Sequence, residues 1–166
     1  MGSNLIFLWP ILLGFIARVE SDPSRGGGND NITKRNVINF GILVYKFTER
    51  NPKDFIGYGC WCGIGGEGKP VDDLDGCCKA HDKCYDEIMQ SEDCPFAKAV
   101  YVMSYSVTGD GEKTKCNSPS SYMIYGKFRS LLCKCDLIAA RCFAKSSYQE
   151  KYRKYPQEKC GETEER

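Results

Sequence analysis

Apolar residues recur with helical periodicity in three parts of the chain. Residues 36–47 place their apolar side chains on one stripe, which predicts a short amphipathic helix. Residues 74–89 contain no proline and few β-branched residues, and they predict a long helix. Residues 121–143 predict a second long helix. These segments together predict a mainly α-helical fold.

Two short polar segments lie between the long helices and are prone to form strands. Residues 104–108 and 112–115 flank the turn Gly109-Asp110-Gly111, which predicts a small two-stranded hairpin. Before the first long helix, residues 58–70 contain five glycines. This density of glycines is incompatible with a regular helix or strand. It favours an irregular loop with a tightly folded backbone.

The N-terminal region has the pattern of a targeting segment. Residues 5–17 are free of charge but too short to cross a bilayer, which needs about 20 helical residues, so we expect a signal peptide over residues 1–21. Residues 22–35 have almost no apolar side chains and end in a dibasic pair, which indicates a pro-segment. We therefore expect a secreted mature domain over residues 36–166.

Charge and cysteine content narrow the function classes. The chain has 23 basic and 22 acidic residues, so it has no basic excess with which to bind nucleic acid. It also has 11 cysteines, which a secreted protein would hold mainly as disulfides.

The cysteine spacing predicts how the long helices pack. Cys77 and Cys84 are seven residues apart, and so are Cys135 and Cys142. Seven residues make about two helical turns, so each pair lies on one face. If the helices are antiparallel, Cys77 meets Cys142 and Cys84 meets Cys135 at disulfide distance.

The only histidine lies between these two predicted cross-links. His81 must then face the second helix, where Asp136 directly follows a cross-linked cysteine. An imidazole aimed at a carboxylate can act as a general base. Cys78 points in another direction, and its simplest partner is Cys62 in the glycine-rich segment.

Three motifs carry a family resemblance. They are residues 58–70 (YGCWCGIGGEGKP), 77–85 (CCKAHDKCY) and 133–143 (CKCDLIAARCF), and they closely resemble the secreted calcium-dependent phospholipase A2 family. The resemblance covers roughly residues 36–160. It implies hydrolysis of the sn-2 acyl ester of glycerophospholipids at a membrane or micelle surface, on a fold of three main helices and a two-stranded wing.

The resemblance also implies roles for individual residues. His81 corresponds to the general base and Asp136 to the carboxylate that orients it, with Tyr85 and Tyr105 as hydrogen-bond donors to that carboxylate. The nucleophile is then water. The chain has no G-x-S-x-G motif, so nothing supports a covalent acyl-serine route.

A calcium cofactor is implied in the same way. The implied ligands are the backbone carbonyls of Trp61, Gly63 and Gly65 and the carboxylate of Asp82. Oxygen donors suit calcium, and a glycine-dense loop can turn its carbonyls inward. The Gly63 N–H is the implied donor to the oxyanion.

The first predicted helix carries the implied acyl channel. Val37, Phe40 and Val44 fall where the family lines that channel. The alternative is that this apolar face is ordinary core.

The implied disulfides are Cys60–Cys160, Cys62–Cys78, Cys77–Cys142, Cys84–Cys135 and Cys116–Cys133. They leave Cys94 unpaired, either as a free thiol or as a link to another chain.

Two rival interpretations remain. Cys77, Cys78, His81 and Cys84 could bind zinc, although secretion and the cysteine spacing favour disulfides. The scaffold could also serve as a non-catalytic binding protein or toxin, although the presence of both His81 and Asp82 argues against it.

Overall fold

The computed structural model describes residues 30–161, with side chains described from residue 36. The helices are α1 (Asp30–Thr48), α2 (Asp73–Gln90), α3 (Ala99–Val102) and α4 (Gly126–Lys145), and the strands are β1 (Val107–Thr108) and β2 (Lys115–Cys116). Short 3-10 helices lie in the loops, namely η1 (Pro52–Asp54), η2 (Gly111–Lys113), η3 (Pro119–Ser121), η4 (Glu150–Tyr152) and η5 (Gln157–Lys159). The predicted mainly helical, disulfide-rich fold is confirmed.

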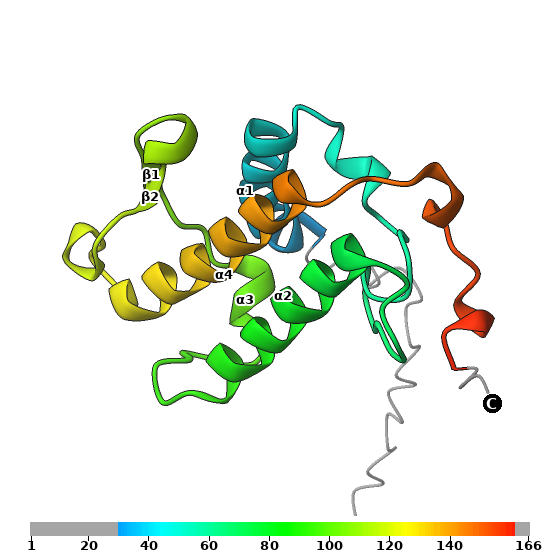
Figure 1. Ribbon diagram of the computed structural model, residues 1–166. Coiled ribbons are helices and arrows are strands. Elements are labelled where there is room, and N and C mark those ends of the chain that lie inside the picture. The colour runs from blue at the N-terminus through cyan, green and yellow to red at the C-terminus, as the bar shows by residue number, and fades with distance from the viewer. Residues whose placement is uncertain (1–29, 162–166) are drawn as a thin grey trace, which may run out of the picture.

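The two long helices α2 and α4 lie side by side and antiparallel (Figure 1). The disulfides Cys77–Cys142 and Cys84–Cys135 join them, each with a Cα–Cα distance of 5.8 Å. Helix α1 packs on α4, and α3 packs against both α1 and α2. The small antiparallel wing, in which Val107 pairs with Cys116, projects from one side of this assembly (Figure 1).

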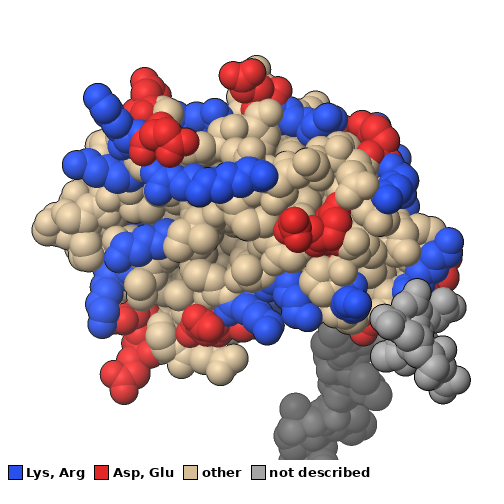
Figure 2. Space-filling view, viewed as in Figure 1, with Lys and Arg blue, Asp and Glu red and all other residues tan. Residues whose placement is uncertain are grey.

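The core lies where the four helices meet. Leu43, Leu74, Val100, Phe128 and Leu132 are among its most deeply buried side chains, and each is at most 1% exposed. On the face shown in Figure 2, acidic and basic side chains are intermingled rather than gathered into one patch, in keeping with the formal net charge of +1. Within residues 30–161, no helix is both long and apolar enough to cross a membrane.

Three predicted boundaries were wrong. Helix α1 begins at Asp30 rather than at residue 36, because no glycine or proline lies between Gly28 and residue 36. The dibasic pair at 34–35 therefore lies inside a helix. The predicted signal peptide, and the pro-segment up to residue 29, lie outside the described residues.

Helix α4 begins at Gly126 rather than at residue 121. The intervening chain first forms η3 and then turns through Tyr125, which has a left-handed φ of 53°. A Cβ at Gly126 would lie 2.0 Å from the Pro119 carbonyl oxygen, so the backbone folds back tightly there. The second hairpin arm, predicted over residues 112–115, is displaced to Lys115–Cys116 because η2 occupies the first half of the predicted arm.

Candidate active site

A histidine and an aspartate meet between the cross-linked helices. Nε2 of His81, on α2, lies 2.7 Å from Oδ1 of Asp136, on α4. The Asp136 side chain is fully buried and the His81 side chain is 10% exposed. An ionised carboxylate can only accept, so Nε2 of the neutral imidazole carries the proton and Nδ1 has a free lone pair.

Two tyrosines complete the surroundings of Asp136. The Tyr85 hydroxyl donates to Oδ1 and the Tyr105 hydroxyl donates to Oδ2, each at 2.6 Å. Burial, reinforced by the negative charge of Asp136, raises the pKa of both phenols. Both hydroxyls therefore stay protonated, and the carboxylate accepts three hydrogen bonds.

Aromatic rings hold the imidazole in place. The Phe40 ring, from α1, stacks on His81 with 4.4 Å between centroids and 20° between planes. The Tyr85 ring lies 4.3 Å from the same imidazole. Of the other two residues of the predicted channel, Val44 is buried in the core and Val37 is 58% exposed at the surface. Of these three residues, Phe40 is the one that stacks on the imidazole.

The glycine-rich loop is tied to α2 by the disulfide Cys62–Cys78. Asp82 lies one helical turn after Cys78 and therefore on the same face of α2. Loss of solvation is the main cause that raises the pKa of the Asp82 carboxyl to about 6, against an opposing effect of His81. Within the described part of the chain, no cation or hydrogen-bond donor pairs with this carboxylate.

The loop offers unpaired carbonyl oxygens. Those of Gly63 and Gly65 accept no hydrogen bond from any described residue, and Gly65 has a positive φ of 79°. The Trp61 carbonyl accepts the Gly63 N–H at 2.8 Å, so that N–H is already engaged. No cluster of three or more His, Cys, Asp or Glu side chains suited to a metal occurs among the described residues. An unpartnered carboxylate and free carbonyls form an oxygen donor set that fits calcium.

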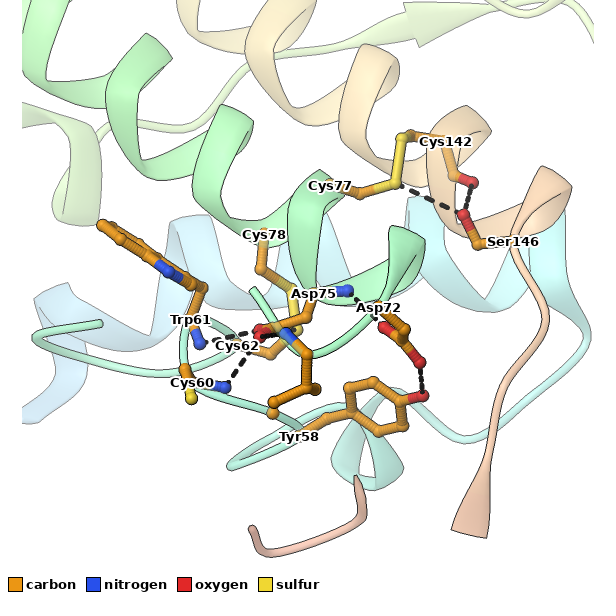
Figure 3. The surroundings of a disulfide bond; sticks show 12 residues. Tyr58, Cys60, Trp61, Cys62, Asp72, Asp75, Cys77, Cys78, Cys142 and Ser146 are labelled. Atoms are coloured by element: carbon orange, nitrogen blue, oxygen red, sulfur yellow. Dashed lines mark hydrogen bonds between the residues drawn. A yellow bond between two sulfur atoms is a disulfide. The ribbon is translucent and has the colours of Figure 1, made fainter. Parts of the chain in front are cut away.

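Asp75 organises this loop, and the sequence analysis did not identify it. Its fully buried carboxylate accepts backbone N–H groups from Cys60 at 2.8 Å, Trp61 at 2.7 Å and Val71 at 3.0 Å. Figure 3 shows the first two of these bonds, which reach from the start of α2 into the loop. A Cβ at Gly59 would come within 2.3 Å of this carboxylate. The available signal was an aspartate in the first turn of a helix that follows a glycine-rich segment.

The cysteines form the five pairs that the resemblance implied, which are Cys60–Cys160, Cys62–Cys78, Cys77–Cys142, Cys84–Cys135 and Cys116–Cys133. Cys94 is the remaining free cysteine, and its thiol lies 3.3 Å from the Phe96 carbonyl oxygen. The zinc alternative is wrong, because all three of its cysteines are held in disulfides.

Comparisons with known proteins agree with this architecture. The family model described as Phospholipase A2 matches residues 37–153. A "Phospholipase A2" of Calliactis polypus is 37% identical over 152 residues, covering 90% of this chain and 89% of the relative. "Phospholipase A2 A2-actitoxin-Cgg2a" of Condylactis gigantea is 40% identical over 75% of this chain and 99% of the relative. A "Phospholipase A2" of Bos taurus is 33% identical over 81% of this chain and 92% of the relative. The chain therefore belongs to the phospholipase A2 family.

Proposed function

We propose that this protein is a secreted, calcium-dependent phospholipase A2 that hydrolyses the sn-2 acyl ester of glycerophospholipids to a lysophospholipid and a fatty acid. The observation that carries the proposal is the 2.7 Å contact between His81 and Asp136, which leaves Nδ1 of the imidazole free to accept a proton. The buried Asp136 fixes the ring orientation, and Asp82 follows His81 directly on α2.

The chemistry follows from these protonation states. Nδ1 of His81 accepts a proton from a water molecule as the water oxygen attacks the ester carbonyl carbon. Asp136 stabilises the resulting imidazolium through the proton on Nε2. When the tetrahedral intermediate collapses, the imidazolium returns the proton to the departing glycerol oxygen. Water has then been added across the ester bond and His81 is neutral again.

The carboxylate of Asp82 and the carbonyls of Trp61, Gly63 and Gly65 would hold calcium. When bound, the ion would polarise the ester carbonyl and stabilise the negative charge that develops on its oxygen. The Gly63 N–H can donate to the same oxygen only after it leaves the Trp61 carbonyl, so the loop must rearrange locally.

The first helix supplies an apolar approach to the imidazole. Phe40 stacks on His81, Val44 is buried in the core, and Val37 is exposed. We propose that the protein acts at the surface of a phospholipid membrane or micelle, with these side chains along the path of the acyl chain. We also propose that residues 1–21 direct secretion and that the pro-segment is removed after Arg35.

A toxin role is a second candidate, carried by the names of two relatives. The Condylactis gigantea protein is named an actitoxin, and the similar "Phospholipase A2 A2-hormotoxin-Apt1a" of Adamsia palliata is 39% identical over 78% of this chain. A toxin can retain lipid hydrolysis, so the candidate that differs from the enzyme is a non-catalytic binding protein or toxin on the same scaffold, which would show no turnover.

The test is fatty acid release from phosphatidylcholine vesicles that carry different labels at the sn-1 and sn-2 positions. We expect release of the sn-2 label in the presence of calcium, none in the presence of a chelator, and none from a folded His81→Gln variant. Activity that persists in that variant would refute the assigned base. An intact but inactive wild-type protein would favour the non-catalytic candidate.

A further inference from the structure

We propose that Asn36 is a positioning residue that orients the Tyr85 hydroxyl toward Asp136 and thereby holds this carboxylate in place against His81. The inference rests on the proposed function, because it concerns the same catalytic pair. Asn36 is the first residue after the dibasic pair, and its side chain is only 2% exposed. It lies on α1, whereas Tyr85 lies on α2 and Asp136 on α4.

The Asn36 amide makes two hydrogen bonds to distant parts of the chain. Its Nδ2 donates to the Tyr85 hydroxyl oxygen at 2.8 Å and also to the backbone carbonyl of Val100, on α3. The carbonyl fixes the orientation of the amide, because a flipped amide would turn its oxygen toward another acceptor. Both amide hydrogens are thus committed to acceptors on two other helices.

The direction of each bond gives Tyr85 a defined role. An amide nitrogen can only donate, so the Tyr85 oxygen accepts from Asn36 and its own proton is left for Oδ1 of Asp136. That oxygen is also the one that lies against Nε2 of His81. Tyr85 and His81 therefore donate to the same oxygen, and the anchored Tyr85 hydroxyl fixes where that oxygen lies relative to the imidazole. The chain of bonds therefore runs from α1 to the imidazole through Tyr85 and Asp136.

The two tyrosines differ in this respect. Among the described residues, none donates to the Tyr105 hydroxyl, which serves the other carboxylate oxygen. The reinforcement is thus confined to Oδ1, which faces the imidazole.

The other half of the Asn36 amide argues against a purely structural role. Its Oδ1 is buried and has no hydrogen-bond partner among the described residues. An unpaired buried acceptor is unfavourable for folding, and an apolar side chain would fill this place without that penalty. The feature that the amide adds is its donor pair, aimed at Tyr85 and Val100.

The first test is a double-mutant cycle between Asn36→Leu and Tyr85→Phe, measured as kcat and KM on phosphatidylcholine vesicles with saturating calcium. We expect Asn36→Leu to lower kcat about fivefold with little change in KM, which is the value of one hydrogen bond. In the Tyr85→Phe background the further loss should be less than about twofold, because the partner is already gone. Equal losses in both backgrounds, or no loss, would overturn the inference.

Asn39→Leu is the matched control. Asn39 lies on the same helix and also donates to a backbone carbonyl, that of Tyr105 at 3.1 Å, but it contacts no tyrosine hydroxyl. We expect its effect on kcat to be the same with Tyr85 as with Phe at position 85. If Asn36→Leu fails to fold, Asn36→Asp replaces it in the same cycle. Aspartate keeps the shape of the asparagine side chain but lacks the Nδ2 donor.

A second measurement does not depend on turnover. The chain has one histidine, so the downfield proton resonance of its Nε2–H can be assigned without ambiguity. We expect this resonance to shift in folded Asn36→Leu and to stay in place in Asn39→Leu. An unchanged resonance in Asn36→Leu would overturn the inference, whereas an inactive wild-type protein with the expected shift would overturn only the proposed function.

Discussion

Oδ1 of Asp136 accepts from Nε2 of His81 at 2.7 Å while the whole Asp136 side chain is closed to solvent. The disulfides Cys77–Cys142 and Cys84–Cys135 hold the two helices that carry this pair, and they flank His81 in the sequence. The separation of the acid from the base is therefore fixed by covalent cross-links as well as by packing. Such preorganisation favours proton transfer, because the groups need not be ordered during the reaction.

Replacing Asp136 with asparagine should lower kcat by about two to four orders of magnitude. The asparagine amide can donate to Nε2, which would place the imidazole proton on Nδ1 and remove the free lone pair. Vesicle hydrolysis with saturating calcium measures the effect, and circular dichroism checks the fold. Asp110→Asn is the matched control, because Asp110 is an exposed carboxylate on the wing and pairs with Lys46 of α1. Turnover within a few-fold of wild type in Asp136→Asn would contradict the role given to this carboxylate.

Replacing Asp82 with asparagine should stabilise the calcium-free protein at pH 7. The folded pKa of Asp82, about 6, lies above its ordinary value of 3.8, so the folded protein holds a proton between pH 4 and 6 that the unfolded chain has lost. Ionisation of Asp82 therefore lowers the free energy of unfolding as the pH rises through this window. Because the carboxylate is partly exposed, we expect a gain of about 1 kcal/mol in Asp82→Asn at pH 7, vanishing near pH 4.

Calcium should reverse this order of stability. Bound calcium would stabilise the wild-type protein by mass action and have little effect on Asp82→Asn. Calcium affinity of the wild type should also fall as the pH drops below about 6, because the metal must displace the proton on Asp82. Calorimetry with calcium and with a chelator tests both statements. Equal calcium-induced shifts of Tm in the two proteins would exclude Asp82 as a ligand.

Replacing Asp75 with asparagine should loosen the glycine-rich loop. The amide group would face backbone N–H groups that now donate to a carboxylate, and hydrogen bonds to a charged group are worth about 1.5–3 kcal/mol each. We expect a loss of about 3 kcal/mol in the free energy of unfolding and weaker calcium binding. Urea denaturation and calcium titration measure the two effects. Asp73→Asn, in the same helical turn but exposed, should change stability by less than about 0.5 kcal/mol.

Local patterns determined much of this protein. Apolar periodicity located the three main helices, and the Asp-Gly turn located the hairpin, because both signals arise from neighbours in the chain. The seven-residue cysteine spacing also predicted the antiparallel pairing of α2 and α4, since two turns of helix return a side chain to the same face. The motifs around Cys62, His81 and Asp136 were sufficient to indicate the family.

Tertiary contacts decided the rest. The start of α4 depends on the close approach of Gly126 to Pro119, and the order of the loop depends on the buried Asp75 carboxylate, which accepts from Cys60, 15 residues earlier in the chain. The amide of Asn36 reaches Tyr85, 49 residues away, through the packing of α1 against its neighbours. A sequence lists these polar groups but not their partners. Which buried donor meets which acceptor is settled only when the helices pack and each group must find its hydrogen bond away from water.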